Sequence, residues 1–70
     1  MINISIFIND NEIAEYNSDI IPRKSEIINL ALEFEGYKSK KYKVCDVEYY
    51  TEVYNDNSAD VNVILYVNEI

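Results

Sequence analysis

The first residues of the chain alternate strictly, with isoleucine at positions 2, 4, 6 and 8 and Asn3, Ser5 and Phe7 between them. Successive side chains of a β-strand point to opposite faces, so this period of two indicates a strand with one buried face. Asn9, Asp10 and Asn11 tolerate turn conformations, and residues 12–16 are typical of a returning strand. The pattern therefore predicts an N-terminal β-hairpin.

A second hairpin is expected at the C-terminus. Residues 42–53 form a long β segment with apolar side chains on both faces, so the strand must bend across a core or contain a bulge that switches its buried side. Residues 55–60 are a polar loop, and residues 61–67 alternate again between apolar and mixed positions. We expect these last two strands to pair with each other.

Residues 25–35 fit two patterns. A helix would place Ile27, Leu30, Ala31 and Phe34 on one stripe and end at Gly36, whereas a strand would alternate Ile28, Leu30, Leu32 and Phe34 with their neighbours. The turn-like residues 36–39, which precede another strand, favour a hairpin. We predict a strand here, with a short helix within residues 25–35 as the alternative.

Seventy residues allow a single domain, residues 1–70, with a small and efficiently filled core. Eleven isoleucines, six valines and seven tyrosines suit a pleated sheet better than a helix. Five strands in two hairpins predict an all-β (mainly β) fold, a small five-stranded barrel of the SH3-like or OB-like type, closed or partly open.

The charge of the chain is segregated along the sequence. Residues 1–22 carry four acidic and no basic residues, and residues 44–70 carry six acidic and no basic residues. All six basic residues lie in residues 23–43, together with three glutamates, within a formal net charge of −7. Such a chain repels nucleic acid over most of its surface.

Three segments carry a resemblance to a family: Ile21-Pro22-Arg23-Lys24-Ser25-Glu26, Tyr42-Lys43-Val44-Cys45-Asp46-Val47, and the closing residues 61–70. Together they resemble small proteins of phages, prophages and mobile elements. The resemblance implies an SH3-like barrel and, for most members, no assigned activity. Ser25 stands where that pattern has glycine, and residues 27–41 are longer than usual.

Residues suited to catalysis or metal binding are scarce. Histidine is absent, and Cys45 lies in a strand beside valines without a basic partner. Residues 56–60 resemble the start of a calcium-binding loop, but Val61 and Val67 replace the required glycine and glutamate. We therefore expect no enzyme activity, no cofactor and no metal.

The last strands combine carboxylates with tyrosines, which are enriched at protein interfaces. We hypothesise a non-enzymatic interaction protein, encoded by a phage or mobile element, that binds and inhibits a basic or nucleic-acid-handling host protein, as a nucleic-acid mimic or anti-defence factor. The expected partner-binding residues are Asp46, Glu48, Tyr50, Glu52, Tyr54 and Tyr66.

Two alternatives stay open from the sequence. The chain could be a structural or self-assembling module of a virion or scaffold, associating through exposed strand edges. It could also bind single-stranded nucleic acid weakly through Tyr37, Lys38, Lys40, Lys41 and Tyr42, although direct nucleic-acid binding is disfavoured by the net charge. The single cysteine and the alternating N-terminus lead us to expect a cytoplasmic protein of a bacterial host cell, with no membrane contact and with homo-oligomerisation allowed.

Overall fold

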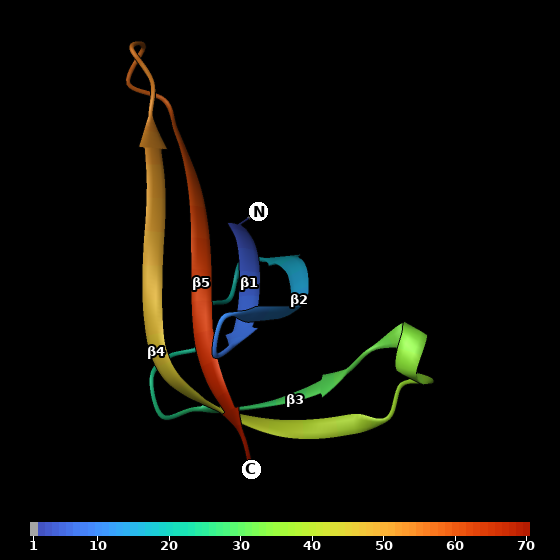
Figure 1. Cartoon of the computed structure of the whole chain (residues 1–70). Helices are drawn as coiled ribbons and strands as arrows, with labels where there is room; N and C mark the ends of the chain where they lie inside the picture. Colours follow the sequence, from blue (N-terminus) through green and yellow to red (C-terminus); the bar gives the residue numbers. More distant parts are fainter. Residues whose placement is uncertain (1) are drawn as a thin grey trace.

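A computed structural model describes residues 2–70 as five strands and one turn of 3-10 helix (Figure 1). The elements are β1 (Ile2–Ile8), β2 (Asn11–Ser18), β3 (Ile27–Ala31), η1 (Glu33–Glu35), β4 (Ser39–Val53) and β5 (Ala59–Glu69). Both predicted hairpins are present, because β1 pairs with β2 and β4 pairs with β5, each in antiparallel orientation. The all-β prediction is confirmed.

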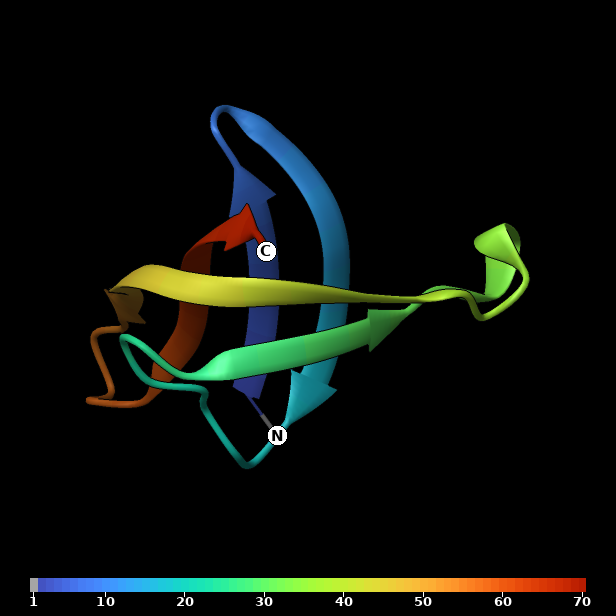
Figure 2. The ribbon, with the colours of Figure 1, turned by 90° about the horizontal axis from the view of Figure 1, so that it is seen from below.

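All five strands belong to one sheet in the order β2-β1-β5-β4-β3. The two hairpins are joined by a parallel pairing of β1 with β5, in which Asn3 to Phe7 lie opposite Asn62 to Tyr66. The sheet curls into a half-barrel, so that β3 and the first half of β4 cross β1 and β2 at a steep angle (Figure 2). β2 and β3 are its two edge strands, and the barrel is therefore partly open.

The core lies on the inner, concave face of the curled sheet. Seven side chains are buried there, two from β1, two from β4 and three from β5: Ile4, Ile6, Tyr42, Val44, Val63, Leu65 and Val67. Residues of β2, β3 and the preceding loop, including Tyr16, Ile21, Ile28 and Leu30, pack around this cluster. Within each strand the buried residues occupy every second position, as expected for a sheet with one buried face.

A β-bulge in β4 changes which residues face inward. Val44 lies opposite Val67, whereas Asp46 lies opposite Tyr66, so two steps along β4 match one step along β5. Even-numbered Val44 and odd-numbered Val47 consequently share the inner face, since Val47 lies opposite the buried Leu65. The two-sided apolar pattern left a bend or a bulge open, and the structure has the bulge.

Residues 25–35 form a strand followed by a short turn. β3 pairs with the start of β4, and η1 contributes only three residues, so the longer helix considered for this segment is not present. Gly36 and Tyr37 then adopt the left-handed backbone conformation, with φ of 72° and 60°, and return the chain into β4. The hairpin reading was correct because the turn chemistry of residues 36–39 outweighed the helix propensity of Leu, Ala and Glu.

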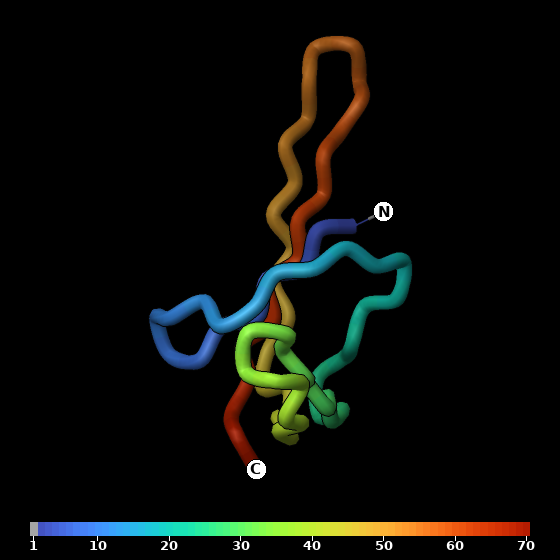
Figure 3. The backbone as a smooth tube through the Cα atoms, turned by 90° about the vertical axis from the view of Figure 1, so that its right-hand side faces the viewer, coloured from blue at the N-terminus to red at the C-terminus, as the bar shows by residue number. Residues whose placement is uncertain are grey.

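The β4–β5 hairpin extends beyond the half-barrel as an arm, seen at the top of Figures 1 and 3. We define the arm as residues 46–66; its strands pair from Asp46 opposite Tyr66 to Val53 opposite Ala59. The arm gives the molecule its elongated dimensions of 43 × 24 × 22 Å. Its outer half packs against no other strand of residues 2–70, so its two faces are both exposed.

Leu65→Ala should lower the free energy of unfolding by about 2–4 kcal/mol, because it removes a fully buried side chain and leaves a cavity. A chain of this length has roughly 4–10 kcal/mol in total. Val53→Ala, on a side chain 70% exposed on the arm, should cost less than about 1 kcal/mol. Urea unfolding followed by circular dichroism measures both, and similar losses for the two variants would contradict the division between core and arm.

Candidate acidic interaction face

The bulge in β4 places the acidic side chains of the arm on the outer face of the sheet. Asp46, Glu48, Tyr50 and Glu52 alternate with the inner-face residues and lie opposite Tyr66, Ile64, Asn62 and Asp60 of β5. All of these charged side chains are exposed. Four carboxylates therefore share one face of a two-stranded ribbon.

Three tyrosines, Tyr50, Tyr54 and Tyr66, lie on the same face. The Tyr66 hydroxyl donates to Glu48 Oε2 at 3.3 Å, and its ring lies 6.2 Å from the ring of Phe7 between centroids. The Tyr54 hydroxyl donates to Asp60 Oδ2 at 2.7 Å. The structure thus brings all six residues singled out from the sequence onto one surface, which we call the acidic face and extend to Asp60.

β1 and β2 continue this surface in a way that the sequence did not reveal. The parallel pairing places Phe7 beside Tyr66, and Phe7 lies opposite Glu12 of β2. Asn3 Nδ2 donates to Glu15 Oε1 at 2.8 Å on the same side of the sheet. No local pattern indicates a parallel pairing between residues 59 positions apart, so Glu12 and Glu15 could not have been assigned to the face. Asp60 could have been found by counting across the predicted hairpin loop.

Two tyrosines of the acidic face, Tyr54 and Tyr66, have raised pKa values. The Asp60 carboxylate, as hydrogen-bond acceptor and with further contributions from burial and the charge of Glu52, raises the pKa of Tyr54 to about 12. Burial, followed by the negative charge of Glu48, raises the pKa of Tyr66. Both shifts reflect the closeness of the phenol groups to carboxylates on this surface.

The opposite, inner face of the arm has a different character. Tyr49, Thr51 and Val53 of β4 lie opposite Val63, Val61 and Ala59 of β5, and none of these side chains is charged. Tyr49 and Val53 are 60% and 70% exposed. The arm is thus an amphipathic ribbon with one acidic and one apolar face.

The basic residues proposed for single-stranded nucleic acid are not brought together. Tyr42 is buried in the core, where its ring is unavailable for stacking on a base. Lys41 lies opposite Asn29 and Lys40 opposite Leu30, so the two lysines point to opposite faces of the sheet. Lys40 Nζ lies 3.8 Å from Glu35 Oε2.

Cys45 and Asp56, which were considered for catalysis and metal binding, take part in local hydrogen bonds. Cys45 is half-buried at the bulge, where Asn68 Nδ2 donates to its sulfur at 3.1 Å. Asp56 Oδ1 accepts hydrogen bonds from the backbone and hydroxyl of Ser58, which holds the arm's loop in an Asx turn and lowers the pKa of Asp56. Among residues 2–70 no group of three or more Cys, Asp or Glu side chains is arranged to hold a metal ion.

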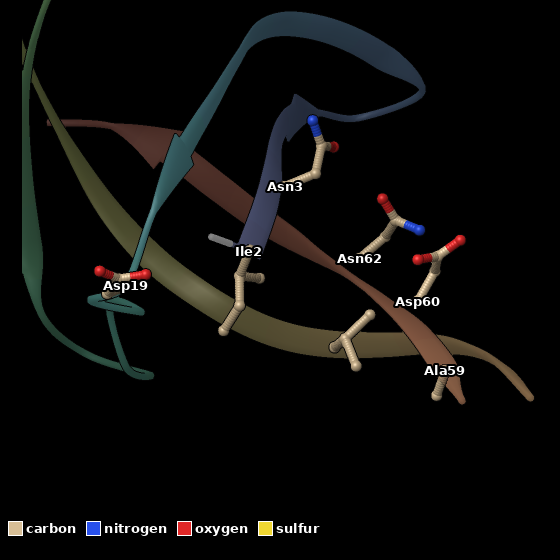
Figure 4. A pocket seen from close by; sticks show the side chains of 7 residues that line it. Ile2, Asn3, Asp19, Ala59, Asp60 and Asn62 are labelled. Carbon is tan, nitrogen blue, oxygen red and sulfur yellow. The ribbon is translucent and has the colours of Figure 1, made fainter. Parts of the chain in front are cut away.

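A hollow of about 420 Å³ lies between the start of β1 and the outer part of β5 in the arm (Figure 4). Asn3, Asn62 and Asp60 line one side of it, while Ile2 and Ala59 point to the other side and Asp19 lies apart from Asp60. Its polar groups do not converge on one point, as they do in a site that orients a small ligand. The acidic face is therefore the stronger candidate.

No protein-family model matches the chain, and comparison with curated proteins and with solved structures found no significant match. Within residues 2–70 there is no helix with the length and apolar character needed to span a membrane. The function must accordingly be inferred from the acidic face itself.

Replacing Asp60 by Asn should return the pKa of Tyr54 from about 12 toward 10, because the charged acceptor of its hydrogen bond is lost. A pKa raised in the folded state stabilises the fold below the unfolded value of 10, and this contribution is lost as the pH rises from 10 to 12. In Asp60→Asn this contribution is absent, so Tyr54 should no longer cause a loss of stability between pH 10 and pH 12. Absorbance titration of tyrosinate measures the pKa, with Asp56→Asn as the control that leaves Tyr54 unchanged; an unaltered Tyr54 titration in Asp60→Asn would contradict the hydrogen bond.

Proposed function

We propose that the protein is a non-enzymatic interaction module that binds a basic protein through its acidic face. The observation that carries the proposal is the sorting of charge on the arm: Asp46, Glu48, Glu52 and Asp60 share the outer face, and residues 44–70 contain no basic residue. Of these four, Asp46 alone lines a hollow together with the basic residues Arg23 and Lys24. Unneutralised charge of one sign attracts a partner of the other sign and accelerates its association.

The tyrosines give the face a second means of binding. Tyr50 and Tyr54 are 55% and 46% exposed, and Tyr66 and Phe7 form an aromatic pair at the base of the arm. Aromatic rings bury a large apolar area at little cost in side-chain entropy, and arginine stacks on them. A partner rich in arginine and lysine is therefore the best match.

The shape of the face supports mimicry of a nucleic acid. Eight residues of β4 in the arm extend over about 26 Å, and their carboxylates follow one another along a narrow ribbon. A line of negative charge of this kind competes with a phosphate backbone for a basic groove. Together with the resemblance to phage and mobile-element proteins, this leads us to propose a target that handles nucleic acid, such as a host defence protein, in the cytoplasm of a bacterial host.

Affinity capture with three matched baits tests the proposal. Wild-type protein and the control Glu33→Gln/Glu35→Gln/Glu69→Gln should retain the same basic protein from a bacterial lysate, and moderate salt should release it. The variant Asp46→Asn/Glu48→Gln/Glu52→Gln, which has the same net charge as the control, should retain at least about tenfold less of it.

Equal capture by the two triple variants would show that net charge, rather than the acidic face, is responsible. Capture that is insensitive to salt, or of acidic proteins only, would refute the proposal.

A further inference from the structure

The arm has an unpaired strand edge next to the acidic face. β3 pairs with β4 only from Ser39 to Lys43, and the last contacts on that side join Val44 to Ser25 and Glu26. Beyond this point no strand within residues 2–70 lies on that side of β4, while β5 occupies the other side as far as Val53. Figure 1 shows the outer half of β4 standing free along this edge.

The hydrogen-bonding groups at the open edge can be assigned. The Tyr54 amide donates to the Ser58 carbonyl, which makes this pair a hydrogen-bonded one. Hydrogen-bonded and non-hydrogen-bonded pairs alternate along an antiparallel ladder, so Glu52 and Tyr50 bond β5 and the residues between them do not. Tyr49, Thr51 and Val53 therefore direct their N–H and C=O groups to the open edge, as Val44 does toward Glu26 and Ser25.

The side chains along this edge differ between the two faces. An added strand would place one set of its side chains beside Glu48, Tyr50 and Glu52 on the outer face, and the alternate set beside Tyr49, Thr51 and Val53 on the inner face. The outer neighbours favour lysine or arginine, and the inner neighbours favour valine, isoleucine or threonine. The edge thus specifies a strand in which basic and apolar residues alternate.

A second copy of the chain is a poor match for the same edge. Pairing of β4 with β4 would gather Glu48 and Glu52 of both copies on one outer face, with no basic residue of the arm to separate them. Like charges on neighbouring strands destabilise a sheet, and charged residues on an edge strand are a means by which proteins avoid self-pairing.

A hollow lies where the open edge begins, and an added strand would end there. The hollow, of about 480 Å³, lies between the loop before β3 and the base of the arm; its lining residues are Pro22, Arg23, Lys24, Asp46, Val47 and Tyr49. Pro22, Val47 and Tyr49 offer apolar contacts, whereas Arg23 and Lys24 would repel a basic residue. The basic residues of the partner consequently belong on the outer face, beside Glu48 and, beyond the hollow, beside Glu52.

We infer that the open edge of β4 over Tyr49–Val53 binds an extended segment of its partner, with alternating basic and apolar residues, as an additional antiparallel or parallel strand of the sheet. This inference rests on the proposed function and adds to it the mode of binding and the sequence pattern of the partner. Backbone hydrogen bonds supply part of the affinity and the alternate side chains supply the specificity, as in other cases of strand addition.

The test uses a fluorescent seven-residue peptide, capped at both ends, in which lysine alternates with valine, and two isomers methylated on either the valine or the lysine amides. Methylation removes the donor from one edge of the peptide only. One isomer should bind at least about tenfold more weakly than the unmodified peptide, and the other should bind equally well, as measured by fluorescence anisotropy. Loss on valine methylation indicates an antiparallel strand, and loss on lysine methylation a parallel one.

Glu48→Gln/Glu52→Gln should weaken binding of the unmodified peptide about threefold to tenfold and flatten its salt dependence, while Glu33→Gln/Glu35→Gln should leave both unchanged. Equal affinity of the two methylated isomers, whether high or low, would overturn strand addition. If the peptides then still bound in a salt-dependent way, the acidic face would remain the binding surface without strand addition. If the unmodified peptide does not bind, strand addition fails, and the affinity capture then decides separately whether the proposed function fails too.

Sedimentation of the free protein tests whether a second copy of the chain occupies the open edge. A monomer is expected at micromolar concentration. A dimer that Thr51→Pro dissociates would show that the edge is occupied by a second copy, because this substitution removes an edge-facing N–H without removing a bond to β5, and it would overturn the inference.

Discussion

The bulge in β4 between Val44 and Asp46 determines the character of both faces of the sheet. Before it, even-numbered residues such as Tyr42 and Val44 enter the core; after it, odd-numbered residues such as Val47 do so. If β4 continued in regular alternation through Cys45, without the bulge, Asp46 and Glu48 would face the core, where unpaired carboxylates cost several kcal/mol. One inserted residue therefore allows a single fifteen-residue strand to line the core and to carry the acidic face of the arm.

The remainder of the molecule supports the arm in this position. Seven buried side chains hold the half-barrel together, and the parallel pairing of β1 with β5 fixes the base of the arm. The outer half of the arm buries little, and residues 44–70 contain no basic side chain to offset the repulsion among its carboxylates. Hydrogen bonds from Tyr66 to Glu48 and from Tyr54 to Asp60 organise the face locally. Like charges gathered on one face do not stabilise the fold, and their arrangement supports the binding role that we propose.

Much of the fold could be predicted from local patterns. The alternation of residues 2–8 and 61–67 identified two strands, and the two-sided apolar pattern of residues 42–53 indicated a bend or a bulge without locating it. Asp46, Glu48 and Glu52 are separated by two and four positions, a spacing that places them on one face of a regular strand. Long-range features could not be predicted in this way. The parallel pairing that places Phe7 beside Tyr66, the burial of Tyr42 and the contribution of Glu12 and Glu15 depend on how distant strands meet. The open edge likewise depends on β3 beginning only at Ile27, so that the pairing of β3 with β4 goes no further toward the arm than Lys43.

The central claim is that the arm presents an acidic face together with an unoccupied backbone edge, and amide hydrogen exchange measured by NMR tests it most directly. In the free protein, the amides of Tyr50 and Glu52 should exchange at least about tenfold more slowly than those of Tyr49, Thr51 and Val53, because only the former are bonded to β5. Addition of the lysine–valine peptide should slow exchange at Tyr49, Thr51 and Val53 selectively. Equal protection of both sets in the free protein, or exchange at Tyr49, Thr51 and Val53 that is unaffected by the peptide, would contradict the account.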